Sequence, residues 1–173
     1  MKTNRLVLNA LLIAMHTVLC FFSPNFGNMK LTLSGLPILI GSLLLGPVDG
    51  LLIGLLGSLT HQMLSFGFTA TTLLWVLPAA VRGFIVGMYA KHKNFRVNRA
   101  GLVGIVISTG LLVTAMNTAS IFIDSKIYGY YSVAVVFGTL IPRIVSSILT
   151  SLIYVVLVPE IMRYLKKIPI SKK

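Results

Sequence analysis

The chain has 173 residues, of which 56% are hydrophobic and only 10% are charged, and its mean hydropathy is +0.94. A soluble domain carries about 25% charged residues, so this composition excludes an ordinary soluble protein and indicates an integral membrane protein. The net charge of +12 does not indicate a nucleic-acid-binding protein, because the basic residues lie between apolar runs. We expect one all-α membrane domain over residues 1–173.

The apolar runs predict a bundle of six transmembrane helices, since a helix needs about 20 apolar residues to cross the hydrocarbon core. Pro, Gly and charged residues separate the runs. The predicted spans are 5–22, 31–46, 49–66, 71–90, 100–123 and 132–165. Spans 31–46 and 49–66 are short and a tight turn joins them, so a re-entrant pair that does not cross fully is an alternative.

The positions of Lys and Arg predict the orientation, because these residues accumulate on the cytoplasmic side of membrane proteins. With the N-terminus inside, six spans leave only Lys30 and Lys126 outside. The basic residues then placed in the cytoplasm are Lys2, Arg5, Lys91, Lys93, Arg96, Arg99, Arg163, Lys166, Lys167, Lys172 and Lys173. We therefore expect a multi-pass protein of the bacterial cell membrane with both termini in the cytoplasm.

Two spans carry small residues at a spacing of four. Ala10 and Ala14 lie one turn apart on one face of the first span, and Gly50 and Gly54 do so in the third. Such pairs allow a second helix to approach closely, which favours association in lipid. For Ala10 and Ala14 the alternatives are association with a second helix and internal packing, whereas for the glycines we expect internal packing.

Polar side chains interrupt the apolar runs and are candidates for one outward-facing pocket. Arg82 and Arg143 are the most informative, because an arginine at membrane depth costs at least about 2.5 kcal/mol on insertion scales and rarely lacks a partner or a task. At about 1.5 Å of rise per residue, the other candidates lie in the outer halves of their helices. The predicted pocket residues are Gln62, Thr71, Thr72, Trp75, Arg82, Asn117, Thr118 and Arg143.

Several candidates have a predicted role or a structural alternative. Asn117 and Gln62 would act as paired hydrogen-bond donors and acceptors. Trp75 would form a stacking wall, and an arginine would bind an acidic group of the ligand. The arginines would otherwise tie helix ends together through backbone carbonyls, and Trp75 would anchor the helix at the membrane interface. Thr71 and Thr72 would otherwise bond back to their own helix.

The sequence does not indicate an enzyme, a cofactor or a metal site. His16 and His61 lie on different predicted helices, with no Asp or Glu within a few residues of either. Asp49 and Glu160 fall at predicted cytoplasmic ends, and Asp124 falls in a predicted outer loop. No carboxylate is therefore expected within the membrane for acid–base chemistry or proton coupling.

Several motifs together resemble the substrate-binding S components of energy-coupling factor (ECF) transporters. They are the Ala10 and Ala14 pair, the Gly-Pro-x-x-Gly turn within the stretch 36–50, the Asn117-Thr118 pair and the Pro142-Arg143 pair. The last two pairs are most similar to the folate-type branch. The resemblance implies that the protein captures a water-soluble vitamin at the outer face, with folate or pantothenate favoured by the two arginines.

The resemblance also implies partners. S components dock on a shared membrane scaffold subunit that carries two cytoplasmic ATPases, and Ala10 and Ala14 would belong to the docking face. The sequence has no Gly-x-x-x-x-Gly-Lys-Ser/Thr phosphate loop, so another chain would hydrolyse ATP. The alternatives are a self-sufficient carrier that works as a homodimer, and a membrane scaffold protein without a small ligand.

Overall fold

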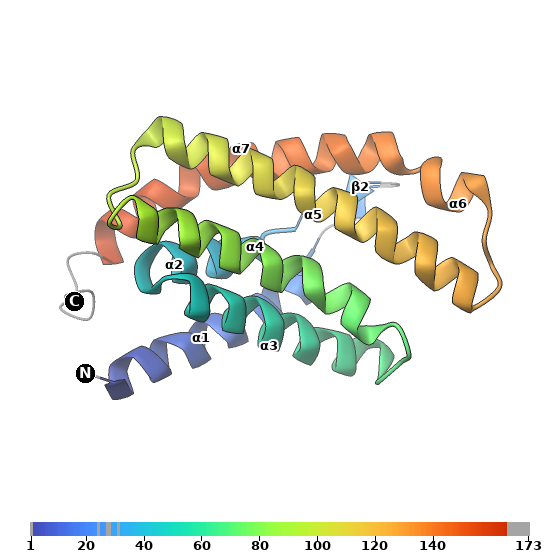
Figure 1. Ribbon diagram of the computed structural model, residues 1–173, viewed down its shortest axis with the longest axis horizontal. Coiled ribbons are helices and arrows are strands. Elements are labelled where there is room, and N and C mark those ends of the chain that lie inside the picture. The colour runs from blue at the N-terminus through green and yellow to red at the C-terminus, as the bar shows by residue number, and fades with distance from the viewer. Residues whose placement is uncertain (1, 24, 27–28, 31, 166–173) are drawn as a thin grey trace.

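The computed structural model describes residues 2–23, 25–26, 29–30 and 32–165, and most of them are helical (Figure 1). The helices are α1 (Lys2–Phe21), α2 (Gly35–Leu45), α3 (Pro47–Phe66), α4 (Thr72–His92), α5 (Arg99–Ile127), α6 (Val133–Phe137) and α7 (Leu140–Leu165). Between α1 and α2, the two-residue strands β1 (Asn25–Phe26) and β2 (Met29–Lys30) pair antiparallel. The predicted all-α bundle is confirmed.

Four segments are long and apolar enough to span a membrane within the part of the chain that the structure describes. They are Thr3–Phe21, Thr72–His92, Arg99–Ile127 and Val133–Leu165. α2 has only 11 residues and reaches about 16 Å, which is short of a hydrocarbon core of about 30 Å. The predicted span 31–46 is thus not one full-length helix.

α2 lies inside the bundle, where α1, α3, α4 and α7 surround it. Nine of its 11 residues are buried. Leu39 and Leu43 pack with residues of α4, α5 and α7, while Ile38 and Ile40 pack with residues of α1 and α3. Protein side chains therefore cover the short helix, and its length need not match the bilayer.

The turn between α2 and α3 follows from its sequence. Gly46 ends α2 with φ +107°, a conformation that side chains disfavour, and Pro47 begins α3, where its missing N–H is not needed. Further along α3, a Cβ on Gly50 would collide with the backbone carbonyl of Gly83 on α4, and one on Gly54 with that of Ala79. The internal packing predicted for Gly50 and Gly54 is confirmed.

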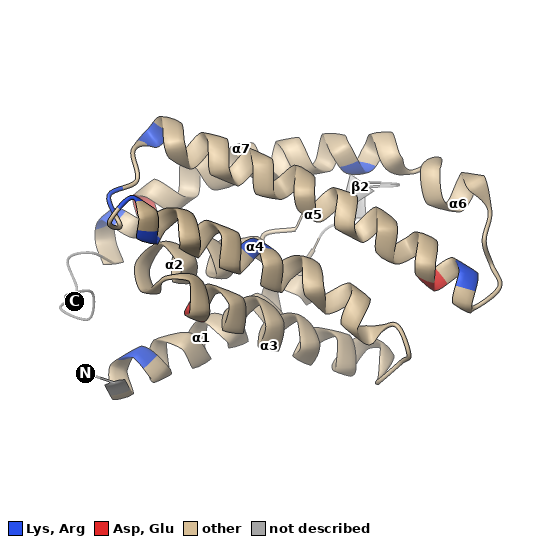
Figure 2. Ribbon diagram, in the orientation of Figure 1, with Lys and Arg blue, Asp and Glu red and all other residues tan. Residues whose placement is uncertain are grey.

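α1 begins and α7 ends at the same end of the bundle (Figure 1). Figure 2 shows that most described Lys and Arg residues gather there. Lys126 is in the last turn of α5, and α5 ends at the opposite end of the bundle (Figure 1). Lys166, Lys167, Lys172 and Lys173, which were also predicted for this side, lie outside the described residues. The two ends of the bundle therefore differ strongly in charge, as the sequence predicts.

A polar cluster fastens α1 to the turn between α2 and α3 at this basic end. Arg5 forms an ion pair with Asp49, and its Nη2 also donates to the carbonyl of Leu45 at 3.2 Å. Asn9 Nδ2 donates to Asp49 Oδ1 at 2.6 Å. Since Asp49 is buried and serves two donors from α1, we infer that it fixes the position of that helix.

Asp49→Ala is expected to lower the free energy of unfolding by about 1–3 kcal/mol, because it removes charge-assisted hydrogen bonds to a buried carboxylate. The Arg5 side chain is 54% exposed, so water screens part of the ion pair and keeps the loss moderate. Thermal unfolding in detergent measures the change, with Glu160→Ala, an exposed carboxylate on α7, as the matched control. Equal stability of the two variants would contradict the assigned role of Asp49.

Candidate functional site

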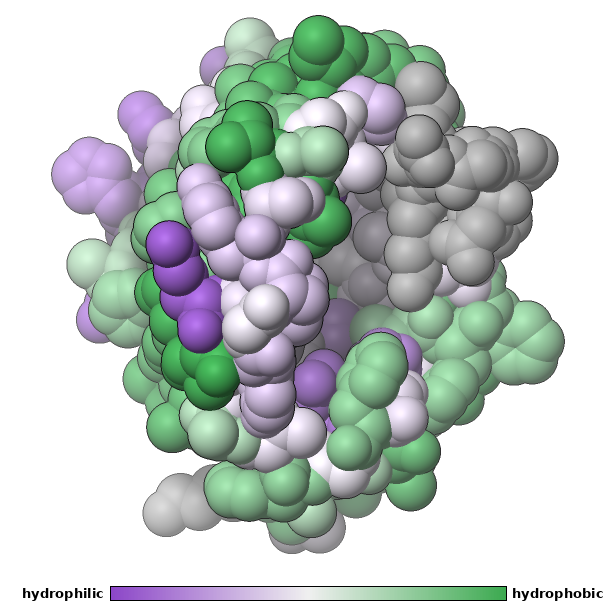
Figure 3. All heavy atoms as spheres, turned by 90° about the vertical axis from the view of Figure 1, so that its right-hand side faces the viewer, coloured by the Kyte–Doolittle hydropathy of each residue, from purple (hydrophilic) through white to green (hydrophobic). Residues whose placement is uncertain are grey.

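A cavity of about 740 Å³ lies between α1, α2, α3, α4, α5 and α7. This volume falls within the range of about 300–1,000 Å³ that is usual for sites that bind small molecules. Figure 3 looks onto the end of the molecule opposite the basic end and shows a hollow with hydrophilic side chains inside it. The cavity is thus open at the end away from the first residues of α1.

The cavity brings together five of the eight side chains predicted for a pocket. They are Gln62 of α3, Trp75 and Arg82 of α4, Asn117 of α5 and Arg143 of α7. They come from four helices, so their proximity depends on the tertiary packing of the bundle. The other three predicted residues, all threonines, are not among the residues that line it.

The three threonines make local or interhelix bonds. Thr71 Oγ1 donates to Asp124 Oδ1 at 2.5 Å. Thr72, the first residue of α4, accepts through its Oγ1 from the backbone N–H of Thr69 in the preceding turn, at 2.8 Å. Thr118 Oγ1 donates to the carbonyl of Thr114, one turn back on α5, at 2.8 Å. These bonds lie at the start of α4 and in the second half of α5, and they point to structural roles.

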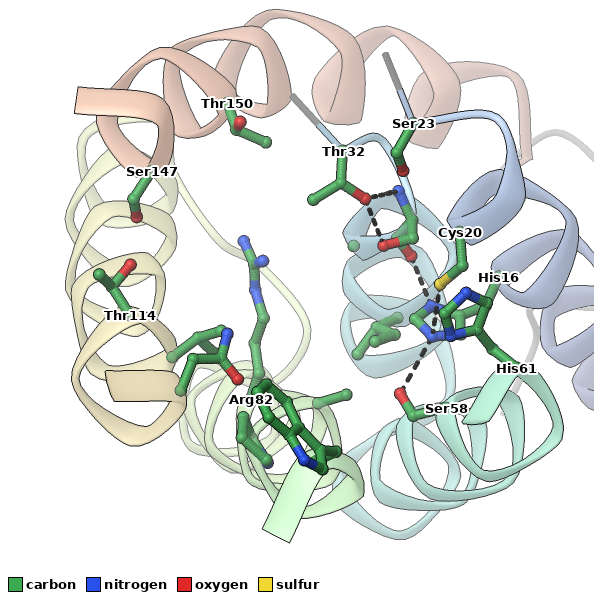
Figure 4. A pocket seen from close by; sticks show the side chains of 18 of the residues that line it. His16, Cys20, Ser23, Thr32, Ser58, His61, Arg82, Thr114, Ser147 and Thr150 are labelled. Carbon is green, nitrogen blue, oxygen red and sulfur yellow. Dashed lines mark hydrogen bonds between the residues drawn. The ribbon is translucent and has the colours of Figure 1, made fainter. Parts of the chain in front are cut away.

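Arg82 is the buried cation of the cavity. Its residue is only 8% exposed, and its side chain extends from α4 into the cavity (Figure 4). The guanidinium carbon lies 5.0 Å from the centre of the Tyr154 ring, but Nε and Nη2 are buried without a hydrogen-bond partner in the described residues. Unsatisfied buried donors are costly, so these two N–H groups are suited to an acceptor on a ligand.

Tyr154 supports Arg82 from α7 and also fixes the start of α2. Its hydroxyl donates to the carbonyl of Thr32 at 2.5 Å and accepts from the N–H of Gly35 at 3.0 Å. A Cβ on Gly35 would lie 2.8 Å from both Arg82 Nη1 and the Tyr154 hydroxyl. Glycine at this position therefore allows the arginine, the tyrosine and α2 to meet.

A second cationic and hydroxyl-rich wall comes from α7. Arg143, Ser147 and Thr150 follow one another at intervals of one turn and line the cavity. Arg143 Nη1 and Ser146 Oγ are buried without a hydrogen-bond partner among the residues described. Sequence patterns singled out only the arginine, although the hydroxyl residues at helical spacing after it were a usable signal.

The opposite wall comes from α1 and α3 and centres on His16. This residue is 3% exposed. Its Nδ1 lies 2.7 Å from the Ser34 carbonyl, and its Nε2 lies 3.1 Å from Ser58 Oγ. A carbonyl only accepts, so Nδ1 carries the proton and Nε2 is free to accept from Ser58. Figure 4 shows His16 and His61 on the same side, facing Thr114 and Ser147 across the cavity.

His16 and His61 thus share a wall, which their separation in sequence did not reveal. No group of three or more His, Cys, Asp or Glu side chains suitable for a metal ion occurs in the described ranges. His61 instead stacks edge-on with Phe21, at 4.9 Å between ring centres. This wall offers hydrogen-bonding and aromatic groups for an organic ligand.

Among the residues that the structure describes, the lining of the cavity contains two arginines and no carboxylate. Its other polar groups are hydroxyls, side-chain amides and imidazoles, next to the indole of Trp75. Such a lining fits a ligand with a flat ring, many hydrogen-bonding groups and oxygen acceptors for the guanidinium groups. The arrangement suits the binding of such a ligand.

The comparisons with known proteins agree on one family. Residues 4–162 match the model of the family described as "ECF transporter, substrate-specific component". The riboflavin transporter RibU of Staphylococcus aureus (strain TCH60) is 25% identical over 183 aligned residues, which cover 96% of this chain and 95% of that protein.

A solved structure also shares the fold. It is described as "Structure and mechanism of the S component of a bacterial ECF transporter", and it superposes with a TM-score of 0.69 at 24% identity, covering 96% of this chain and 99% of that one. The family is one of membrane transport components and not of enzymes. Because the family match spans most of the sequence, the chain belongs to the substrate-specific components of ECF transporters.

Proposed function

We propose that this protein captures riboflavin and delivers it for import through an ATPase-driven module. The proposal rests on one observation: a relative that aligns with nearly the whole of this chain is a riboflavin transporter. The cavity of about 740 Å³ in this chain gives such a ligand a place to bind. Folate and pantothenate, which the sequence favoured, find no support in these comparisons. Riboflavin therefore replaces them as the proposed ligand.

The lining of the cavity fits the two chemical parts of riboflavin. The flat isoalloxazine ring would stack against Trp75, and its carbonyl oxygens would accept from the unpartnered N–H groups of Arg82. The ribityl chain carries several hydroxyls, which would bond with Asn117, Ser147 and Thr150. A neutral ligand can thus use the arginines as hydrogen-bond donors.

The distribution of charge supports an outward-facing cavity. Lys and Arg gather at the end where α1 begins and α7 ends (Figure 2), and such a bias is typical of the cytoplasmic side. The cavity opens at the other end (Figure 3). In this orientation both termini are cytoplasmic and the ligand enters from outside the cell.

The exposed face of α1 supports docking on a membrane partner. Ala10 and Ala14 are exposed, as are Leu11 and Val18 on the same face. Small residues on an uncovered helix face allow another helix to approach closely. We assign this face to the scaffold subunit that carries two cytoplasmic ATPases, because this chain has no phosphate-binding loop of its own.

Riboflavin titration of the purified protein tests the ligand and the role of Arg82. We expect tight binding, which quenches riboflavin fluorescence, and a loss of affinity of about tenfold or more in Arg82→Gln, because charge-assisted bonds to the ring are removed. Arg96→Gln, an exposed position in the loop before α5, is the matched control. Asn117→Ala is expected to weaken binding as well.

Two results of this titration would contradict the proposal. Binding of folate or pantothenate in place of riboflavin would show that the ligand is wrong while the binding role stands. Unchanged riboflavin affinity in both Arg82→Gln and Asn117→Ala would place the ligand outside this cavity.

Ala10→Trp tests the docking face. A bulky side chain on α1 should prevent close approach of the scaffold subunit, so ATP-dependent uptake is lost in vesicles that contain the complete transporter, while riboflavin binding is kept. Leu152→Trp, an exposed position on α7, is the control and should transport normally. Loss of binding would place α1 in the ligand site, and uptake without any ATPase would favour a self-sufficient homodimer.

A further inference from the structure

Asp124 is a buried carboxylate near the open end of the cavity, with three hydrogen-bond donors. It is 9% exposed. Its Oδ1 accepts from Thr71 Oγ1 at 2.5 Å and from Trp75 Nε1 at 3.4 Å, and its Oδ2 accepts from the Tyr130 hydroxyl. The sequence placed Asp124 in an outer loop, but α5 continues through it to Ile127, which turns its side chain toward α4.

Hydrogen bonds, and not an ion pair, stabilise this carboxylate. Among the described side chains it has no Lys or Arg within salt-bridge distance, and Lys126 Nζ lies over the Tyr131 ring at 4.0 Å. The bond to Asp124 raises the pKa of Tyr130, which lies in the loop after α5, so its hydroxyl keeps its proton and donates. Charge-assisted bonds of this kind are stronger than neutral ones, so the bonds from Thr71 and Tyr130 hold the carboxylate in place.

Of the three donors to Asp124, Trp75 lines the cavity and so links the carboxylate to the ligand site. It is the single tryptophan of the chain, it lines the cavity, and the bond from its Nε1 runs to Asp124. Asp124 itself does not line the cavity. The carboxylate thus bonds to the indole nitrogen of a residue that lines the cavity, without lining the cavity itself.

We propose that Asp124 is a positioning residue that fixes the indole of Trp75 against the bound vitamin and thereby sets the affinity. A ring held in place before binding loses less conformational freedom when the ligand stacks on it. Thr71 and Tyr130 orient the carboxylate from two further segments, so the outer end of α5, the start of α4 and the loop after α5 act as one support. The affinity part of this proposal rests on the proposed binding of riboflavin.

The chain offers a matched control for this interaction. Ser120 Oγ donates to the carbonyl of Leu74 at 2.8 Å, so it also joins α5 to α4 next to Trp75. This bond does not involve the indole. Ser120→Ala therefore tests the general effect of loosening the two helices, whereas Asp124→Ala also releases the ring.

The first measurement is the fluorescence anisotropy of Trp75 in the empty protein, which needs no ligand. We expect a clear drop in Asp124→Ala, a smaller drop in Asp124→Asn, whose amide oxygen can still accept from the indole, and the native value in Ser120→Ala. If Asp124→Ala does not fold, the comparison of Asp124→Asn with Ser120→Ala decides. An anisotropy in Asp124→Ala equal to that of the native protein would overturn the proposal. If only Asp124→Asn folds, a native anisotropy in that variant would overturn it.

The second measurement is a double-mutant cycle with riboflavin. Asp124→Ala should weaken binding by about tenfold in the native background but by less than about twofold in a Trp75→Phe background, because the group it positions is then absent. Equal losses in both backgrounds would show a general structural role and overturn the proposal. If the native protein does not bind riboflavin, the proposed function fails, and the anisotropy still decides the role of Asp124.

Discussion

A guanidinium group buried in a membrane bundle needs a partner, and Arg82 finds only part of one within the protein. Tyr154 supports the group through its ring, but two guanidinium nitrogens have no partner in the described residues. Such burial is costly in an apolar bundle, so an acceptor supplied by a ligand would offset it. The cavity, the tyrosine on α7 and Gly35 at the start of α2 all serve to keep this group accessible from one end.

The short helix α2 links the site to the rest of the bundle. Its first residue, Gly35, donates its N–H to Tyr154 and leaves no room for a Cβ beside Arg82. The apolar residues of α2 belong to both core clusters. His16 on α1 bonds to the carbonyl of Ser34, just before α2 begins. The segment before α2 therefore links the wall of the cavity to α1, the helix that carries the exposed Ala10 and Ala14.

Composition and charge were enough to predict the membrane bundle, because apolar length and the distribution of Lys and Arg are local properties of the sequence. Arg82 and Arg143 were also predictable, since a charge in an apolar run is conspicuous. The wall formed by His16 and His61 was not, because it depends on the contact between α1 and α3. The prediction for Asp124 was wrong because α5 extends one turn further than hydropathy indicates, and that turn brings the carboxylate to Trp75.

The most direct test of a vitamin-binding role is to identify the small molecules that co-purify with the protein. Protein purified in detergent from cells supplied with a mixture of vitamins would be denatured, and the released compounds would be identified by mass spectrometry. We predict riboflavin at near-equal stoichiometry, and its loss in Arg82→Gln. A protein that releases no vitamin and does not bind riboflavin on later titration would contradict this account.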